Sequence, residues 1–237
     1  MHCFHCNSAN VIKNGRKTRK SKKKIQNFLC KSCKKQFLYD YTYTGCHPSK
    51  RKSVVEHLLR SCGIRDVKAL EKVSYDFIYK TLRSSSSFSW EPRLDTYASV
   101  LIDELYLIVK KKRKEKKLYI TYAYAEETGE ILAFTVGRRD TQQARNILLK
   151  IKCLQIKVTM FYTDNWRSFT KALKEYKHPH TIGKEYTTAI EGFNTFLRTR
   201  LKRLNRRTTA FSKLVTPVMQ LLHLLSWARN TQQKFVK

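Results

Sequence analysis

Two pairs of cysteines near the start of the chain constrain its fold more than any other feature. Cys3 and Cys6 form one CxxC pair, and Cys30 and Cys33 form a second. Each pair can present two thiolates from a tight turn, and four thiolates complete the tetrahedral shell of Zn²⁺. The intervening residues 11–28 are rich in lysine, so we expect a basic hairpin held by the metal, as in a zinc ribbon. Bound zinc would supply folding energy that so basic a segment cannot obtain from an apolar core.

The spacing leaves other states of these cysteines open. A disulfide pair or unligated thiols would also fit it, although the paired arrangement favours zinc. His2 and His5 flank the first pair, and either could replace a thiolate. The isolated Cys46, Cys62 and Cys153 are expected to be ordinary buried thiols.

Positive charge dominates the composition. The 237 residues include 49 Lys and Arg against 18 Asp and Glu, a net charge of +31. This excess indicates a polyanionic partner, because fixed cations displace the condensed counterions of nucleic acid. Hydrophobic residues make up 41% of the chain, which favours a folded core over a disordered basic tail. No apolar run reaches the roughly 18 residues of a membrane span, and no signal peptide follows Met1. We therefore expect a cytoplasmic, nucleoid-associated protein with no membrane partner.

Hydrophobic periodicity predicts three short helices after the cysteine region, with a break at Gly63 and Ser74 as the N-cap of the third. They fit a helix-turn-helix whose last helix, 75–83, would lie in the major groove, although a plain helical bundle has the same periodicity. A serine-rich stretch then marks a linker. The expected domains are a zinc-ribbon DNA-binding module at 1–45, a helix-turn-helix at 50–83, a linker at 84–95 and a larger domain at 96–237.

The larger domain alternates β-rich and helical patterns. Strands are predicted at 99–109, 118–125, 131–136 and 156–163, and helices at 141–151, 166–176, 188–204 and 211–228. This order predicts an α/β domain with a mixed sheet covered by helices, rather than a repeat or a barrel.

Three of the scarce acids occupy unusual positions. Asp103 lies within an apolar strand, where an ionised carboxylate is costly unless a cation or hydrogen bonds compensate. Asp164 follows another apolar strand, at a sheet edge that commonly carries a site. Glu191 lies on a helix face that continues with polar and basic side chains, namely Asn194, Arg198 and Lys202.

Three carboxylates from two strands and a helix match the needs of a two-metal phosphoryl-transfer site. Oxygen ligands hold Mg²⁺, one ion activates the attacking oxygen, and the other stabilises the leaving oxygen. Structural explanations stay open for each acid. Asp164 could cap the following helix, and Asp103 could pair with Lys110. Thr188 and Glu191 have the spacing of a capping box.

A series of motifs runs in order along the chain. These are Asp103-Glu104-Leu-Tyr, Leu118-Tyr-Ile-Thr-Tyr-Ala-Tyr, Thr163-Asp-Asn-Trp, His180-Thr-Ile-Gly-Lys184, Tyr186-Thr-Thr-Ala-Ile-Glu191-Gly-Phe-Asn194 and Arg206-Arg-Thr-Thr-Ala-Phe-Ser-Lys213. With the CxxC pairs, the Tyr41-Thr-Tyr-Thr44 segment and the predicted helices, they resemble the transposases of the bacterial insertion sequence one family over nearly the whole chain.

The resemblance implies a DDE recombinase with a ribonuclease-H-like catalytic fold. Asp103, Asp164 and Glu191 match the positions of its metal-binding triad, which would hold Mg²⁺ or Mn²⁺. His180 matches a histidine of the family that could orient a phosphate or a water, and a structural role is an equal alternative.

The resulting hypothesis is a DNA transposase. It would bind the terminal inverted repeats of its own element, cleave at the 3′ ends and join each 3′-OH to target DNA, so double-stranded DNA is its expected partner. Synapsis of two ends needs a homo-oligomer on DNA. Basic side chains late in the chain would hold the DNA backbone, or else form a solvated face: Lys184, Arg198, Arg200, Lys202, Arg203, Arg206 and Arg207. The alternatives are a zinc-ribbon transcriptional regulator without catalysis and a ribonuclease-H-like nuclease.

Overall fold

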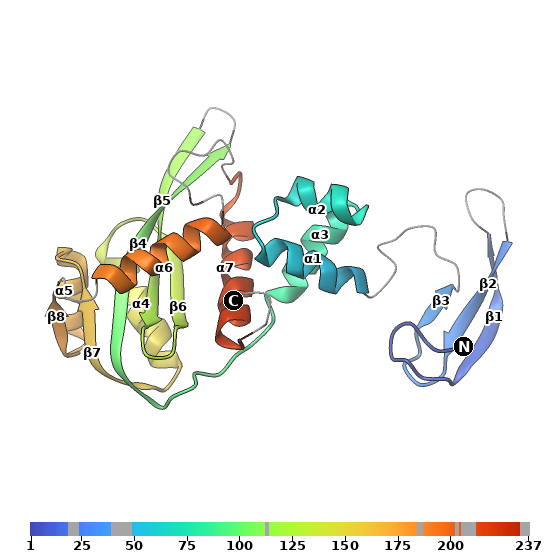
Figure 1. Cartoon of the computed structure of the whole chain (residues 1–237), viewed down its shortest axis with the longest axis horizontal. Helices are drawn as coiled ribbons and strands as arrows, with labels where there is room; N and C mark the ends of the chain where they lie inside the picture. Colours follow the sequence, from blue (N-terminus) through green and yellow to red (C-terminus); the bar gives the residue numbers. More distant parts are fainter. Residues whose placement is uncertain are drawn as a thin grey trace. The chain divides into compact units, whose positions relative to one another are not determined.

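The chain forms two compact units in a computed structural model that describes residues 1–18, 24–38, 49–111, 114–183, 187–201, 204 and 212–232. The first unit comprises Met1–Leu58 and Cys62–Thr81, and the second comprises Leu59–Ser61 and Leu82–Lys237. Figure 1 labels the helices and strands of both.

The first unit begins with a small antiparallel sheet in the order β1-β2-β3. Its strands are β1 (Val11–Thr18), β2 (Lys24–Cys30) and β3 (Gln36–Leu38). The first two form the hairpin expected over residues 11–28. Gly15 sits at an irregularity in this hairpin with φ +64°, a conformation that glycine adopts without strain. The core beside the sheet is only a few rings, centred on the buried Phe37, which is too little apolar area to stabilise the module alone.

Three helices follow, and all but the last residues of the first and third belong to the first unit. They are α1 (Ser49–Leu59), α2 (Ile64–Glu71) and α3 (Tyr75–Ser85). The predicted cap of the third helix is confirmed, because the Ser74 hydroxyl accepts a hydrogen bond from the amide of Phe77 at 3.1 Å. Val54, Val67 and Ile78 are fully buried between the helices. The third helix continues into the serine run that the sequence marks as linker.

A buried carboxylate ties α1 to α2. Glu71 accepts hydrogen bonds from Lys50 at 2.6 Å and from Ser53, and it lies 2.8 Å from His57 Nε2. The Lys50 and Ser53 bonds outweigh burial and lower the pKa of Glu71 from 4.5 to about 2, and His57 adds to this.

This network predicts a pH-dependent stability. Because the folded pKa of Glu71 is depressed, the stabilisation is complete above its ordinary value of 4.5 and is lost as the pH falls toward 2. We expect Glu71→Gln to cost about 2–3 kcal/mol at pH 7 and less than about 1 kcal/mol near pH 2.5, where part of the stabilisation remains because the folded pKa is about 2. Amide hydrogen exchange of α1 and α2 in the full chain, compared with the parent protein across this range, measures both. A cost that stays constant with pH would contradict the assignment.

The second unit is built on a five-stranded mixed sheet in the order β6-β5-β4-β7-β8. Its strands are β4 (Thr96–Lys111), β5 (Lys114–Ala125), β6 (Glu130–Gly137), β7 (Lys157–Thr163) and β8 (His180–Ile182). The first three form an antiparallel meander, and β7 and β8 run parallel to β4. This order, with only the second strand reversed, is the ribonuclease-H-like arrangement that the family resemblance implies.

Helices cover both faces of this sheet (Figure 1). Helices α4 (Thr141–Cys153) and α5 (Arg167–Glu175) pack on a core that includes Val100 and Ile102 of β4. Helix α6 (Thr187–Arg200) packs on the opposite face, and α7 (Val215–Asn230) contacts β6. Because side chains alternate along a strand, the even-numbered residues of β4 from Val100 onward lie on the α4 face, and the odd-numbered ones from Leu101 onward lie on the α6 face.

The structure differs from the predicted elements in several places, including the last helix, which begins at Val215 rather than at 211. Strands β4 and β5 are longer than the predicted 99–109 and 118–125, because polar residues beyond the apolar runs still pair with one another. Strand β8, at 180–182, carries too short a pattern to predict. Helix α6 ends at Arg200 rather than at 204. None of the helices in the described part of the chain has the length and apolar character needed to cross a bilayer.

Candidate metal centres and catalytic site

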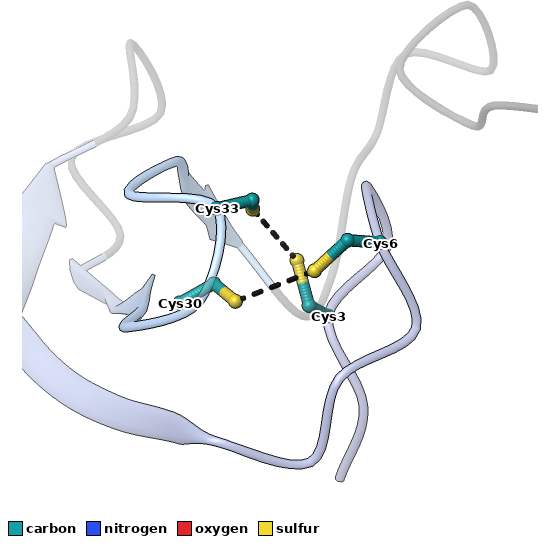
Figure 2. Close-up of side chains that lie close together, drawn as sticks. All are labelled: Cys3, Cys6, Cys30 and Cys33. Carbon is teal, nitrogen blue, oxygen red and sulfur yellow. Dashed lines mark hydrogen bonds between the residues drawn. The ribbon is translucent and has the colours of Figure 1, made fainter.

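The four paired cysteines converge on one point (Figure 2). The Sγ atoms of Cys3 and Cys33 lie 3.7 Å apart, and those of Cys6 and Cys30 lie 3.5 Å apart. All four sulfurs lie within 4.8 Å of one another. A tetrahedron with Zn–S bonds of about 2.3 Å has edges of about 3.8 Å, so this donor set fits zinc. The separations far exceed the roughly 2.05 Å of a disulfide bond.

The two cysteine turns are built alike. The residue after each pair, Asn7 in one turn and Lys34 in the other, has a left-handed φ of 57° and 58° respectively. Each turn is closed by the same backbone hydrogen bond, from the Cys3 amide to the Ser8 carbonyl at 2.9 Å and from the Cys30 amide to the Lys35 carbonyl at 3.0 Å. In the second turn the Cys33 amide is the main cause that lowers the pKa of Cys30, which favours a thiolate at this position of the cluster.

The other candidate ligands lie outside this cluster. In the described part of the chain, neither His2 nor His5 joins the group of four sulfurs. Instead, the His5 ring packs edge-on against Phe37. The expectation of buried isolated thiols is wrong for Cys153, which is exposed, because it lies in the last turn of α4 beyond the helix's buried stripe. Cys62 is half-buried, and Cys46 lies outside the described residues.

A group of acids forms where β7 ends beside β4. Carboxylate oxygens of Asp103, Glu104 and Asp164 lie within 4.8 Å of one another. Ile102 pairs with Thr163 in the parallel register, so Asp164 comes level with the two acids of β4. Side chains from opposite faces of β4 can meet Asp164 because β7 stops at that level. The β4–β7 register therefore unites two of the predicted triad residues.

Asp103 is oriented from the α6 side of the sheet. The Asn194 amide donates a hydrogen bond to Asp103 Oδ2 at 2.8 Å. The Tyr122 hydroxyl lies 3.3 Å from the same oxygen and 2.9 Å from Asn194 Oδ1. Burial, followed by the charge of Asp103, raises the pKa of Tyr122 well above its ordinary value, so it remains a neutral donor. These contacts fix the orientation of the Asp103 carboxylate.

Glu104 is the member of the acidic group that sequence reasoning missed. Its side chain is 7% exposed, and one oxygen accepts a hydrogen bond from Arg139. Its Oε2 is buried without a hydrogen-bond partner. Burial raises the pKa of Glu104 to about 7 against the opposing effect of Arg139. The adjacency of Asp103 and Glu104 was the available signal, but strand alternation assigns them to opposite faces.

Asp164 both holds a turn and faces the other acids. Its Oδ1 accepts a hydrogen bond from the Trp166 amide at 3.0 Å, just before α5 begins. Its Oδ2 lies 3.8 Å from the Arg139 guanidinium, which also lies over the Trp166 ring at 4.9 Å. Burial raises the pKa of Asp164 and the charge of Asp103 adds to this, whereas the hydrogen bond from the Trp166 amide and, to a smaller extent, Arg139 oppose it. Asp164 therefore holds the turn before α5 without capping the helix, whose N-cap is Trp166, and this contact is compatible with a role in the site.

Glu191 and His180, the other two predicted site residues, lie outside the group of three acids. Glu191 is exposed on α6, three residues before Asn194, and it does not join the three acids within 4.8 Å. His180 lies on β8 and its Nε2 is 2.7 Å from the Thr163 hydroxyl. Because that hydroxyl donates to the Asp164 carbonyl at 2.8 Å, it accepts from His180 Nε2–H. Burial, and then Lys174, lowers the pKa of His180, so a neutral ring supports the backbone beside Asp164.

Two of the seven basic residues expected to hold DNA are described. Arg198 is half-buried, and its Nε has no hydrogen-bond partner. The guanidinium of Arg200 lies 5.8 Å from the Phe196 ring centroid. The others lie outside the described residues: Lys184, Lys202, Arg203, Arg206 and Arg207.

Comparison with known proteins agrees with this geometry. A ribonuclease-H-like sheet with acids on its central strand and after the neighbouring strand, together with the family match below, supports a DNA-processing enzyme of the DDE type. The model of the IS1 transposase family matches residues 98–222, just over half of the chain. The chain belongs to the IS1 transposase family.

Two relatives illustrate the similarity. Insertion element iso-IS1n protein InsB of Shigella dysenteriae is 37% identical over 114 residues, which are 48% of this chain and 82% of the relative. Insertion element IS1 4 protein InsB of Escherichia coli (strain K12) is 30% identical over 138 residues, 58% of this chain and 79% of the relative.

Solved structures are less similar to this chain than these relatives are in sequence identity. A chain of the simian T-cell lymphotropic virus intasome matches with a TM-score of 0.43 and 16% identity, covering 76% of this chain and 67% of that chain. The HTLV-2 integrase catalytic core domain in complex with magnesium matches with a TM-score of 0.34 and 13% identity, covering 57% of this chain and 86% of that chain. The fold assignment rests on the strand order itself.

Proposed function

We propose that the chain is a DNA transposase that binds the ends of its own insertion element, cleaves at the 3′ ends and joins them to target DNA. The observation that carries this proposal is the meeting of Asp103 and Asp164 on adjacent strands, in a chain of this family. A protein that merely coats DNA gains nothing from acids clustered next to a polyanion.

Three or four carboxylates would hold the catalytic metal. Asp103 and Asp164 form its base, and the unpartnered Oε2 of Glu104 gives the group a free buried acceptor. Glu191 would complete it from α6, one turn before the Asn194 amide that holds Asp103. This set of hard oxygen donors fits Mg²⁺ or Mn²⁺. When bound, such ions activate an attacking oxygen and stabilise a leaving one.

The protein's own groups position the reaction. Asn194 and Tyr122 fix Asp103, and the His180–Thr163 pair fixes the backbone at Asp164. The attacking groups in the proposal are water for cleavage and the freed 3′-OH for joining. No covalent enzyme intermediate is then needed, because each step is a direct displacement at phosphorus.

End recognition is assigned to the first part of the chain. The zinc ribbon of residues 1–45 would position the DNA, and α3 of the 50–83 helix-turn-helix would enter the major groove. Helix α3 exposes Tyr75, Tyr79 and Arg83 toward solvent. The catalytic domain would follow the linker 84–95 and occupy 96–237, with Arg198, Arg200 and the further basic residues named above on the DNA backbone. Two chains would act together, since two ends are joined.

A strand-transfer assay tests the proposal. The full-length protein is incubated with labelled element ends, a plasmid target and Mg²⁺ or Mn²⁺. We expect end-to-plasmid joined products. Nicking of the ends without joined products would favour the ribonuclease-H-like nuclease, and specific end binding without any strand breakage would favour the regulator.

A further inference from the structure

The hairpin of β4 and β5 continues beyond the five-stranded sheet. Strand β7 pairs with β4 only up to Ile102, and β6 pairs with β5 only from Tyr119 onward. The two long strands remain paired with each other to Lys111 and Lys114. Within the described residues, this two-stranded extension has one bridge to another segment, from Val109 to Ser212. Figure 1 shows the extension projecting past the sheet; we name its described residues, 107–111 and 114–118, the basic arm.

The base of the basic arm is anchored in the fold. Leu107, Val109 and Leu118 are at most 8% exposed. They lie on the face of the hairpin that continues from Asp103, toward α6. An isolated two-stranded hairpin is marginally stable in water, so this apolar face gives the arm a fixed direction.

The outer part of the basic arm is almost entirely cationic. Its described residues 110, 111 and 114–117 are five Lys and one acid, Glu115. The register places Lys111 opposite Lys114, and like charges directly opposite one another destabilise a strand pair. Exposed lysines can also protect sheet edges from unwanted pairing. A polyanion bound along the arm would relieve the repulsion between the lysines. Protection of a sheet edge would leave that repulsion in place.

A cationic and aromatic surface connects the basic arm to the acids. Tyr106 and Tyr119 form a cross-strand ring pair with centroids 5.5 Å apart, on the same face as Glu104. The Arg139 guanidinium lies 5.8 Å from the Tyr119 centroid and 3.8 Å from Asp164 Oδ2. Lys117 continues the same face outward and is exposed. The path thus runs from the carboxylates along the strands to the arm.

We propose that the basic arm binds the phosphate backbone of double-stranded DNA whose cleaved phosphate lies at the acids. This inference rests on the proposed function, because it takes DNA as the substrate. From Asp103 to Lys111 the strand advances about eight residues, or about 26 Å at roughly 3.3 Å per residue. At roughly 3.4 Å per base pair, the arm would contact phosphates about eight base pairs from the reacting one.

The test compares two triple variants of the full chain. The arm variant is Lys114→Gln, Lys116→Gln and Lys117→Gln. The control removes the same charge at exposed positions on α4 and α5, by Lys152→Gln, Lys171→Gln and Lys174→Gln. Binding to labelled element ends is measured against salt concentration, and hydroxyl-radical footprints locate the contacts.

We expect the arm variant to lower the slope of log K against log salt by about 0.9 for each lost phosphate contact, up to about 3. Affinity near 0.15 M salt should fall at least about tenfold, and protection about eight base pairs from the cut should disappear. The control should keep its footprint and its slope within about 0.5. The melting temperature of the arm variant should not fall, since the change removes repulsion.

Three results would overturn the inference. One is an arm variant that binds and protects DNA as the control does. Another is aggregation of the arm variant with unchanged DNA affinity, which would assign the lysines to edge protection. The third is a parent protein that joins ends without protecting DNA at that distance. A parent protein that fails to bind DNA at all would overturn the proposed function as well.

Discussion

Asp103→Asn is expected to lower strand cleavage and joining by about a thousandfold or more, while binding to element ends remains. The amide keeps the shape of the carboxylate and an oxygen that Tyr122 or Asn194 can reach. It loses the charge that holds a divalent cation. Stabilisation of transition-state charge by such ions amounts to several kcal/mol, and about 4 kcal/mol corresponds to a thousandfold in rate. Single-turnover rates with saturating DNA measure the effect.

Two companion variants determine which acid completes the group. Glu191→Gln should match the loss of Asp103→Asn if α6 supplies the third carboxylate, and Glu104→Gln should match it if β4 does. Tyr122→Phe is the control for orientation, since it removes one donor to Asp103 and should cost far less. Undiminished joining by Asp103→Asn would show that the acids are structural.

Cys30→Ser is expected to unfold the zinc module and abolish specific recognition of element ends. Cys30 is fully buried, and structural zinc supplies about 10–16 kcal/mol to small modules of this kind, far more than the few rings around Phe37 provide. Bound zinc should fall from about one ion per chain to nearly none. Elemental analysis measures the metal, and amide hydrogen exchange of β1 and β2 measures the fold.

Matched variants separate ligand loss from a general cysteine effect. Cys153→Ser, at an exposed position outside the cluster, should keep zinc and specific binding. His5→Ala should also keep zinc, because the cluster consists of four sulfurs. Full zinc content in Cys30→Ser, or loss of zinc in His5→Ala, would contradict the four-cysteine assignment.

Much of the fold could be predicted because its signals are local. The CxxC spacing predicted one thiolate cluster, Ser74 predicted a helix start, and the apolar runs predicted the order of strands and helices. The full length of the β4–β5 hairpin could not be predicted from apolar runs, because the residues that pair beyond Val109 and Leu118 are charged. Strand β8 was missed because three residues carry no periodicity.

The site was only partly predictable for a related reason. Asp103 and Asp164 stand out as acids in or after apolar strands, and the parallel register brings them together. Glu104 could not be predicted, because strand alternation places it on the opposite face of β4 from Asp103. The alternation does not show that β7 ends at Thr163, where side chains from both faces of β4 can reach Asp164. Glu191 rests on the family resemblance and the helix pattern, and its distance from the acids in this structure leaves its role a proposal.

The central claim is that a free 3′-OH attacks target DNA directly in a site built around Asp103 and Asp164. The most direct measurement is the configuration at phosphorus when the target carries a phosphorothioate of known chirality at the joining position. A single in-line displacement by the 3′-OH predicts inversion in the joined product. Retention of configuration would require two displacements through a covalent enzyme–DNA intermediate, and would contradict the account.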